Sequence, residues 1–215
     1  EKIPTRKIVA AYDDSLPLTE PAKYFLEIIK EQTNRLIKLT ENLLAVSKNN
    51  VEKLVLKKVN ILPYVENSVR LISSQNSKNH FKTEADENIS EILADTDKFQ
   101  QIMLNILENA SKYSNPDTEI AVKISQTDEE VIIKVTDKGV EIPEKDRERI
   151  FEKFTRLSSP LTQKTEGSGL GLYLTKILVE RMNGTISAYS ESGLTTFEVK
   201  FPIAKFDDDA KVKMQ

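Results

Sequence analysis

The chain has 215 residues, of which 39% are hydrophobic and 30% are charged, so it has enough apolar material for a packed soluble core. Its net charge of −3 does not favour nucleic acid as a partner, and no apolar run reaches the roughly 18 residues needed to span a bilayer. Because cysteine is absent and His80 is the single histidine, disulfides, zinc–thiolate sites and histidine-rich metal sites are excluded.

Residues 1–47 are expected to form a helix hairpin. In its second helix, at 22–47, apolar residues recur at alternating spacings of four and three. This pattern is typical of a helix that packs along a coiled-coil seam, although an amphipathic core helix of a single domain would also show it. Residues 8–12 look like the end of the first helix. The seam residues are Phe25, Ile29, Gln32, Leu36, Leu39, Leu43 and Val46.

Helices and strands are mixed after a basic linker and first short strand at 48–59. Asn60 is placed to cap a helix that runs to about Ser74. The mixture of helices with antiparallel hairpins indicates an α+β fold, a two-layer α/β sandwich with helices over one mixed sheet. Residues 205–215 look like a disordered charged tail. The expected later elements are strands at 80–85 and 90–95, a helix at 96–114, paired strands at 119–126 and 130–137, one short helix near 144–151, a helix from the glycine cluster to about Met182 with a cap at Asn183-Gly184, and strands at 185–190 and 195–202.

Polar residues gather on one arc of the helix at 96–114. Gln101, Asn105, Glu108, Asn109 and Lys112 recur at helical spacing, opposite an apolar side. An asparagine offers a neutral oxygen to Mg²⁺, and a lysine offers a point charge to phosphate. The arc is therefore a candidate metal–phosphate site, and a solvated polar face is the alternative.

A carboxylate, Asp137, directly follows an alternating strand in the segment VTDKGVEIP. A carboxylate at a strand end can accept a hydrogen bond from an exocyclic amine such as that of adenine. An ordinary β-turn is the alternative, because aspartate and glycine are turn residues.

Glycine is scarce and clustered. None of the six glycines precedes Gly139, and three of them fall in the stretch EGSGLGLYL at 166–174. Because a helix follows, the cluster suggests bare amide groups at a helix N-terminus, where an anion such as phosphate binds. The spacing G-x-G-x-G is not that of a dinucleotide fold.

Four motifs occur in the order and at the spacing seen in the catalytic, ATP-binding domain of sensor histidine kinases, and the chain resembles that family. NILENASKYS resembles the N box, DKGVEI the G1 box, IFEKFTR the F box and GSGLGL the G2 box. The resemblance covers residues 52 to about 204, and it implies an ATP-binding catalytic domain at 60–204. The hairpin at 1–47 resembles a dimerisation and phosphotransfer helix pair with a shortened first helix.

The resemblance implies that residues of all four motifs bind Mg-ATP. Asn109 would be the ligand of Mg²⁺, and the expected catalytic residues are Asn105, Lys112 and Arg156, of which Asn105 and Lys112 would contact phosphates. Asp137 would accept the adenine amine. The segment from Pro143 to Ser168 is expected to form a mobile lid. The remaining expected ATP-binding residues are Tyr113 along the nucleotide, Gly139, Ile142 and Leu172 beside the base, Phe151 and Phe154 at the lid, Gly167, Ser168, Gly169, Leu170 and Gly171 around the phosphates, and Thr196 at the far edge of the adenine pocket.

The sequence departs from the family's pattern in three places. The second glycine of the G1 box is Glu141, and the loop in SESGLTTF is shorter than the common form. The phosphoacceptor histidine is expected just before Glu1, because Pro4 fits the proline of the H box. His80 is interpreted as a surface histidine.

The resemblance to sensor histidine kinases implies transfer of the ATP γ-phosphate to a histidine and onward to an aspartate of a response-regulator receiver domain. Asparagine at 105 cannot act as a base, unlike the glutamate of hydrolysing relatives, which suits transfer to a side chain. We expect a homodimer through the hairpin, a cytoplasmic location, and membrane attachment only through segments outside this chain. A pseudokinase, favoured by Glu141, or a non-enzymatic scaffold, favoured by the heptad helix, are the alternatives.

Overall fold

The computed structural model describes residues 19–47, 53–75, 78–157 and 167–205. The chain divides into two compact units, Glu1–Leu43 and Leu44–Gln215. The expected first helix at 8–12, the H-box proline, most of the charged tail and the central part of the expected lid lie outside the described residues. None of the helices in the described ranges is long and apolar enough to cross a membrane.

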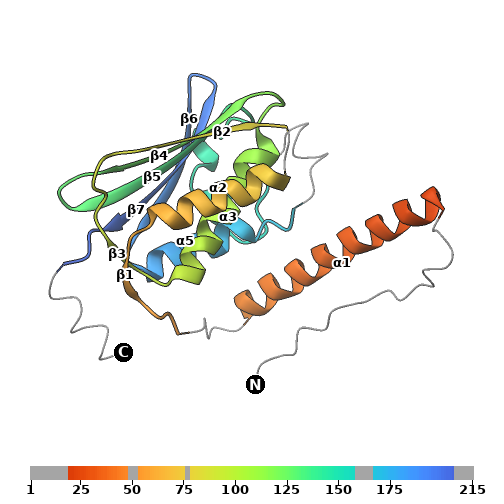
Figure 1. The fold of residues 1–215 in the computed structure, drawn as a ribbon, viewed down its shortest axis with the longest axis horizontal. Coiled ribbons are helices and arrows are strands. Elements are labelled where there is room, and N and C mark those ends of the chain that lie inside the picture. The colour runs from red at the N-terminus through yellow and green to blue at the C-terminus, as the bar shows by residue number, and fades with distance from the viewer. Residues whose placement is uncertain (1–18, 48–52, 76–77, 158–166, 206–215) are drawn as a thin grey trace. The chain divides into compact units, whose positions relative to one another are not determined.

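The first unit contains most of a single long helix, α1 (Glu20–Ser47), coloured red to orange in Figure 1. Several large apolar side chains of this helix lie in solvent, among them Tyr24, Phe25 and Leu36, with exposed fractions of 68%, 62% and 62%. The helix therefore carries apolar surface of the kind that the heptad spacing predicts for a seam.

The second unit is built on a mixed sheet of five strands in the order β2-β4-β5-β7-β6. Only the pair β2–β4 is parallel. A separate two-stranded sheet pairs β1 (Lys57–Val59) with β3 (Ile92–Ala94). The five strands are β2 (His80–Ala85), β4 (Glu119–Gln126), β5 (Glu130–Asp137), β6 (Thr185–Glu191) and β7 (Leu194–Pro202).

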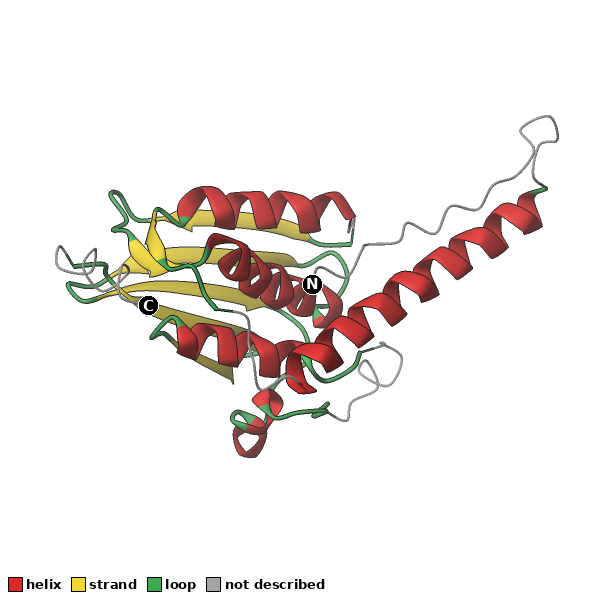
Figure 2. Cartoon of the chain, turned by 90° about the horizontal axis from the view of Figure 1, so that it is seen from below, coloured by secondary structure: helices red, strands yellow, loops and turns green. Residues whose placement is uncertain are grey.

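Three helices cover one face of this sheet: α2 (Leu62–Gln75), α3 (Thr96–Tyr113) and α5 (Gly171–Arg181) (Figures 1 and 2). The core lies between the two layers, because alternate residues of β5 and the apolar side of α3 are buried together. The predicted two-layer α+β sandwich is confirmed.

Local signals fix several of the helix ends. The Asn60 side chain accepts a hydrogen bond from the Leu62 amide at 3.0 Å, so it caps α2 as predicted. Asp95 caps α3 through the amides of Asp97 and Lys98. At the end of α5 the left-handed residue is Asn183, with φ of 58°, and the Gly184 amide donates to the Val179 carbonyl at 2.9 Å.

One element differs from its prediction. The short helix expected near 144–151 is a pair of separate 3₁₀ turns, η1 (Glu144–Asp146) and η2 (Arg149–Phe151). Only Ile150 and Phe151 are buried, so the segment has a single apolar anchor rather than a helical stripe. Too few apolar positions are present to favour a continuous amphipathic helix.

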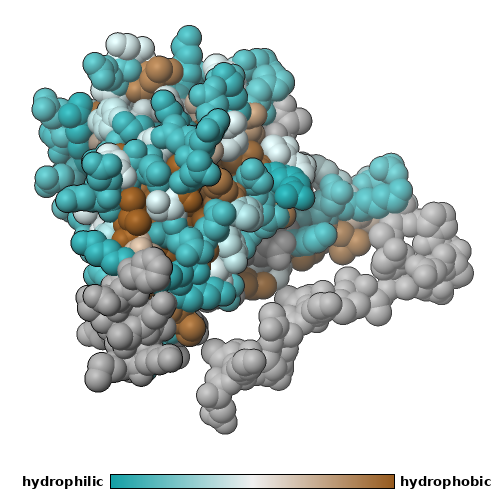
Figure 3. Space-filling view, turned by 60° about the vertical axis from the view of Figure 1, so that its left-hand side comes forward, coloured by the Kyte–Doolittle hydropathy of each residue, from teal (hydrophilic) through white to brown (hydrophobic). Residues whose placement is uncertain are grey.

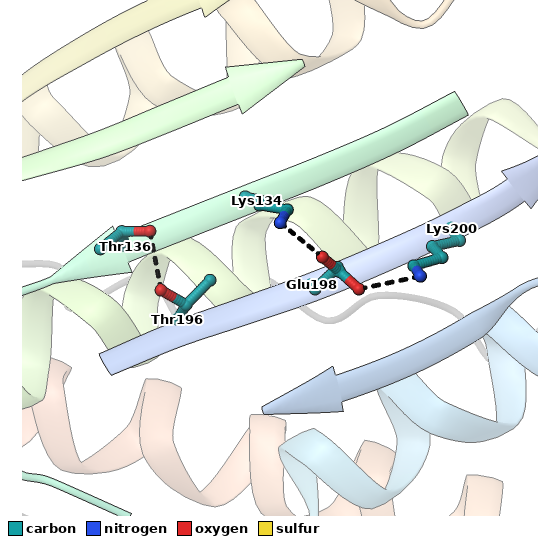
Figure 4. A network of polar contacts seen from close by, with 5 residues as sticks. All are labelled: Lys134, Thr136, Thr196, Glu198 and Lys200. Atoms are coloured by element: carbon teal, nitrogen blue, oxygen red, sulfur yellow. Dashed lines mark hydrogen bonds and ion pairs between the residues drawn. The ribbon is translucent and has the colours of Figure 1, made fainter. Parts of the chain in front are cut away.

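The face of the sheet opposite the helices is polar. Glu198 on β7 binds Lys134 on β5 at 2.8 Å and Lys200 at 3.1 Å (Figure 4). His80 is exposed at the start of β2, as predicted. Hydrophilic side chains dominate the surface of the second unit shown in Figure 3, with some hydrophobic side chains visible among them. This sheet face therefore needs no covering layer.

Candidate functional site

The most unusual polar group of the second unit is the Asp137 carboxylate at the end of β5. Its residue is only 2% exposed, and its Oδ1 atom has no hydrogen-bond partner in the described structure. Burial raises the pKa of this carboxyl from 3.8 to about 7. A buried carboxylate with an unused acceptor is costly, and such groups gather at functional sites.

Gly139 lets the end of β5 pass close to the end of α3. A Cβ atom at Gly139 would collide with the Tyr113 carbonyl oxygen, which accepts a hydrogen bond from the Val140 amide at 3.1 Å. The Asn115 amide donates to the Lys138 carbonyl at 2.9 Å. The glycine is thus required by the protein's own backbone, a reason different from the approach of a base. The contact holds the end of α3 against the residues that follow Asp137.

Asn105 is held between α3 and α5. Its Nδ2 donates to the hydroxyl of the buried Thr175, and that hydroxyl donates to the Gly171 carbonyl at 3.0 Å. A Cβ atom at Gly171 would lie 2.5 Å from Asn105 Oδ1. Gly171, the first residue of α5, therefore allows the asparagine to lie against the start of the helix.

Two cations and a phenol converge at Gly167. A Cβ atom placed on that glycine would lie 3.2 Å from Lys112 Nζ, 3.7 Å from the Tyr113 hydroxyl and 3.9 Å from Arg156 Nε. The Lys112 Nζ also lies 5.4 Å from the centroid of the Tyr113 ring. The end of α3, the F box and the G2 box thus place positive charge at one point. Asn109, half-buried, lies one turn of α3 before Tyr113.

The turn before α5 is fixed by backbone contacts. Gly169 has φ of +69°, and its carbonyl accepts a hydrogen bond from the Phe154 amide at 3.0 Å. A Cβ atom there would meet the Phe154 backbone at 2.6 Å. The Ser168 hydroxyl accepts from the Leu170 amide at 3.3 Å, so that amide is already engaged. The glycines of this cluster thus also serve close packing, besides any binding of an anion.

The two phenylalanines of the F box differ in burial. Phe151 is 5% exposed and belongs to the core, whereas Phe154 is 62% exposed and has φ of 62°. Phe154 therefore contributes its backbone to the turn rather than an apolar side chain. Leu172 is half-buried and packs against the core, and Ile142 is 5% exposed beyond the end of β5.

The register of β5 and β7 separates two adjacent threonines. Thr195 pairs with Asp137, so their side chains share the helix-facing side of the sheet. Thr196 pairs with Thr136 on the opposite side, and their hydroxyls are 2.9 Å apart (Figure 4). The residue beside the aspartate is therefore Thr195, whereas Thr196, which was expected at the far edge of the adenine pocket, lies on the opposite face of the sheet.

Sequence reasoning missed Thr175, Ser190 and Thr195. Thr175 lies four residues after Gly171 on one face of the helix, a spacing that could have signalled it once the helix start was known. Ser190 and Thr195 form the second cross-strand pair from the β6–β7 turn, and only strand pairing shows that Thr195 lies beside the aspartate.

The sequence profile of the family described as "Histidine kinase-, DNA gyrase B-, and HSP90-like ATPase" matches residues 94–205, just over half of the chain. The chain belongs to this ATPase family. The match spans the N, G1, F and G2 boxes, and the resemblance to the catalytic domain of sensor histidine kinases is confirmed.

Curated relatives of the chain include signal transduction histidine-protein kinases named ArlS. The protein from Staphylococcus haemolyticus is 30% identical over 179 residues, which is 82% of this chain and 40% of the relative. ArlS from Staphylococcus aureus is 31% identical over 179 residues, with the same coverage. The chain thus spans about two-fifths of the length of the curated relatives it matches.

Solved structures of histidine kinases share the fold. Full-length ShkA in complex with AMPPNP matches 89% of this chain and 41% of its own, with a TM-score of 0.74 and 25% identity. Histidine kinase ThkA in complex with response regulator protein TrrA matches 89% of this chain and 54% of its own, with a TM-score of 0.69 and 22% identity.

Proposed function

We propose that the second unit binds Mg-ATP and that the intact protein transfers the γ-phosphate to a histidine and onward to a response-regulator aspartate. The family assignment implies ATP binding. The similarity to ArlS kinases supports the histidine as first acceptor, and the solved complex of ThkA with TrrA supports a receiver domain as partner.

The observation that carries the proposal is the buried Asp137 carboxylate with its unused Oδ1. Adenine presents an amine that donates a hydrogen bond, whereas guanine presents an oxygen at the same place. An ionised carboxylate can only accept, so it binds the first base and repels the second. The site would therefore select adenine nucleotides over guanine nucleotides.

The phosphates would lie toward Gly167, where Lys112, Tyr113 and Arg156 converge. Lysine and arginine supply the positive charge that a triphosphate requires. A bound Mg²⁺ would neutralise charge on the phosphate oxygens, and the Asn109 amide oxygen suits this hard cation. The described residues include no group of three His, Cys, Asp or Glu side chains able to hold a metal alone, which fits an ion held mainly by the nucleotide.

Asn105 supports transfer to a protein side chain rather than to water. An amide cannot remove a proton from an attacking water molecule. Its Nδ2 is also committed to Thr175, which holds the side chain in one orientation. We infer that Asn105 orients the phosphate end of the nucleotide against the start of α5.

The first unit would serve dimerisation. Phe25, Ile29 and Leu36 belong to the heptad seam and are 62%, 45% and 62% exposed. A second copy of the helix is the simplest way to cover them. In this proposal the histidine and the receiver-docking surface belong to the helix pair, and the protein acts in the cytoplasm, with any membrane anchor outside residues 1–215.

A pseudokinase is the second candidate function, because Glu141 occupies the place of a family glycine. Its side chain is exposed, and the backbone there does not adopt positive φ. The substitution is thus compatible with an ordinary backbone, which weakens this candidate. Phosphate transfer in a version of the protein that carries the proposed phosphoacceptor histidine would distinguish a kinase from a pseudokinase.

Calorimetric titration of ATP and GTP into the wild type and Asp137→Ala tests the nucleotide site. Loss of a charge-assisted hydrogen bond should cost about 1.5–3 kcal/mol of ATP binding, while GTP binds weakly to both proteins. Lys138→Ala, a change at the exposed neighbouring residue, is the matched control and should bind ATP like the wild type. Equal ATP affinity in the wild type and Asp137→Ala would refute the adenine assignment.

A further inference from the structure

Two hydroxyl groups connect the last hairpin of the sheet to the loop that follows Asp137. Ser190 on β6 and Thr195 on β7 are cross-strand partners, and their hydroxyl oxygens are 2.7 Å apart. The Ile142 amide donates to the Ser190 hydroxyl at 2.8 Å. The Thr195 hydroxyl donates to the Val140 carbonyl at 2.9 Å. The pair thus holds both neighbours of Glu141.

The direction of these hydrogen bonds is determined. A hydroxyl has one proton, and that of Thr195 is committed to the Val140 carbonyl. Ser190 must therefore donate to Thr195 and use a lone pair to accept from the Ile142 amide. The hydrogen bonds therefore run in one direction, from the Ile142 amide through Ser190 and Thr195 to the Val140 carbonyl. Each hydroxyl accepts one hydrogen bond and donates one.

This chain of bonds lies beside the buried carboxylate. Thr195 is 3% exposed and pairs directly with Asp137 across β5 and β7. Ile142, whose amide begins the chain, is 5% exposed. The loop that carries Val140 and Ile142 starts from the strand end where an adenine base would be recognised, so its position bears on the shape of that site.

The short β6–β7 turn makes this arrangement possible. Ser192 and Gly193 have φ of 53° and 79°, as in a two-residue hairpin with positive φ at both central residues. Glu191 then pairs with Leu194, which places Ser190 opposite Thr195 as the next pair. A longer loop would not fix this register by itself.

We propose that Ser190 and Thr195 are positioning residues of the nucleotide site, which hold the loop around Glu141 in place of the glycine that the family's pattern has there. The inference rests on the proposed function, in which Asp137 accepts the adenine amine. The shortened turn and Glu141, two departures from the family's pattern, are then structurally connected. The turn sets the register that pairs the two strand hydroxyls, and these hydroxyls hold the backbone on both sides of the bulky side chain at the glycine position.

The same sheet offers a matched control. Thr136 and Thr196 form another cross-strand hydroxyl pair, 2.9 Å apart, on the face opposite Asp137 (Figure 4). Thr136→Val removes a hydroxyl from a comparable pair on the neighbouring strand without touching the loop. Its effect measures what a merely structural hydroxyl pair contributes.

The test compares Ser190→Ala, Thr195→Val, the double variant and Thr136→Val. Calorimetry measures ATP affinity, thermal unfolding measures stability, and hydrogen exchange followed by NMR measures protection of the Ile142 amide. We expect Ser190→Ala and Thr195→Val each to bind ATP about fivefold to tenfold more weakly than the wild type, which corresponds to one lost hydrogen bond in the site. The double variant should bind about as weakly as either single variant, because both hydroxyls act in one chain. The Ile142 amide should exchange faster in Ser190→Ala.

Conservative variants and the control complete the experiment. Thr195→Ser keeps the hydroxyl and should retain ATP affinity within about twofold, a rescue that bulk packing would not produce. Thr136→Val should bind ATP like the wild type even if it unfolds at a lower temperature. If Thr195→Val does not fold, Ser190→Ala at its half-buried site carries the test.

Three results separate the possible failures. Wild-type ATP affinity in Ser190→Ala, together with faster exchange at Ile142, would show that the hydroxyls are structural only and would overturn the inference. If the losses of ATP affinity in the two single variants add up in the double variant, the two hydroxyls do not act through one connected series of hydrogen bonds, and the inference is overturned. If the wild type binds no adenine nucleotide, the proposed function itself fails, and the inference fails with it.

Discussion

Replacement of Asp137 by asparagine should stabilise the nucleotide-free protein at neutral and higher pH and weaken its binding of ATP. The carboxyl is 2% exposed, Oδ1 has no partner, and burial raises its pKa to about 7. Asparagine has nearly the same shape and no charge. The variant thus removes a buried charge that lowers the stability of the folded protein when no ligand is bound.

The magnitude follows from the pKa. The folded-state pKa of about 7 lies above the ordinary value of 3.8, so the folded protein binds the proton more tightly than the unfolded chain. The resulting loss of stability is small below about pH 4, grows between pH 4 and 7 and is complete above pH 7. One pKa unit corresponds to about 1.36 kcal/mol, which limits the full cost to about 4 kcal/mol, of which roughly 2.5 kcal/mol arises between pH 5 and pH 8.

Urea unfolding of the wild type and Asp137→Asn at pH 5 and pH 8 measures this cost. An unpartnered amide in the variant has its own cost of about 1–3 kcal/mol, but that cost does not depend on pH. We therefore expect the stability of Asp137→Asn relative to the wild type to rise by roughly 2–3 kcal/mol from pH 5 to pH 8. ATP affinity of the wild type should fall as the pH drops below about 7, because the ionised carboxylate accepts a stronger, charge-assisted hydrogen bond from the amine than the neutral acid does.

A stability difference that is the same at both pH values would refute the reasoning, because it would mean that the carboxyl titrates normally in the folded state. Unchanged ATP affinity between pH 8 and pH 5.5 in the wild type would refute the link between the charged carboxylate and the base. Lys138→Ala, at the exposed neighbouring residue, controls for a change of net charge near the site.

Three further predictions concern other parts of the molecule. Glu141→Gly should tighten ATP binding severalfold, by about 1 kcal/mol at most because the side chain is exposed, and Glu141→Gln should give only the part of that gain that comes from removing the charge. Unchanged or weaker ATP binding of Glu141→Gly in a calorimetric titration would contradict this prediction. Gly171→Ala places a methyl group against Asn105 and should weaken ATP binding by roughly 1 kcal/mol, whereas unaltered affinity would show that the asparagine's position is unimportant. Light scattering should show a dimer for a chain with the complete hairpin and a lower mass for its variants Phe25→Glu and Leu36→Glu, and a monomer before substitution would defeat the seam interpretation.

The sequence by itself determined the elements whose signals are local. The polar cap at Asn60, the alternation in 119–126 and 130–137, and the helical spacing in 96–114 each follow from neighbours a few residues apart. The structure has these elements at those positions, with the helix one residue shorter at its end. The four motifs likewise identified the family, because their residue types and order are themselves sequence properties.

Only the tertiary structure decided what several of the motif residues contact. Gly139 meets the Tyr113 carbonyl and Gly171 meets Asn105, contacts between residues far apart in the chain. Strand register placed Thr195 beside Asp137 and sent Thr196 to the other face, since a shift of one residue reverses every side chain. The raised pKa of Asp137 also belongs to the fold, because no single neighbour in the sequence produces the burial that disfavours its charge.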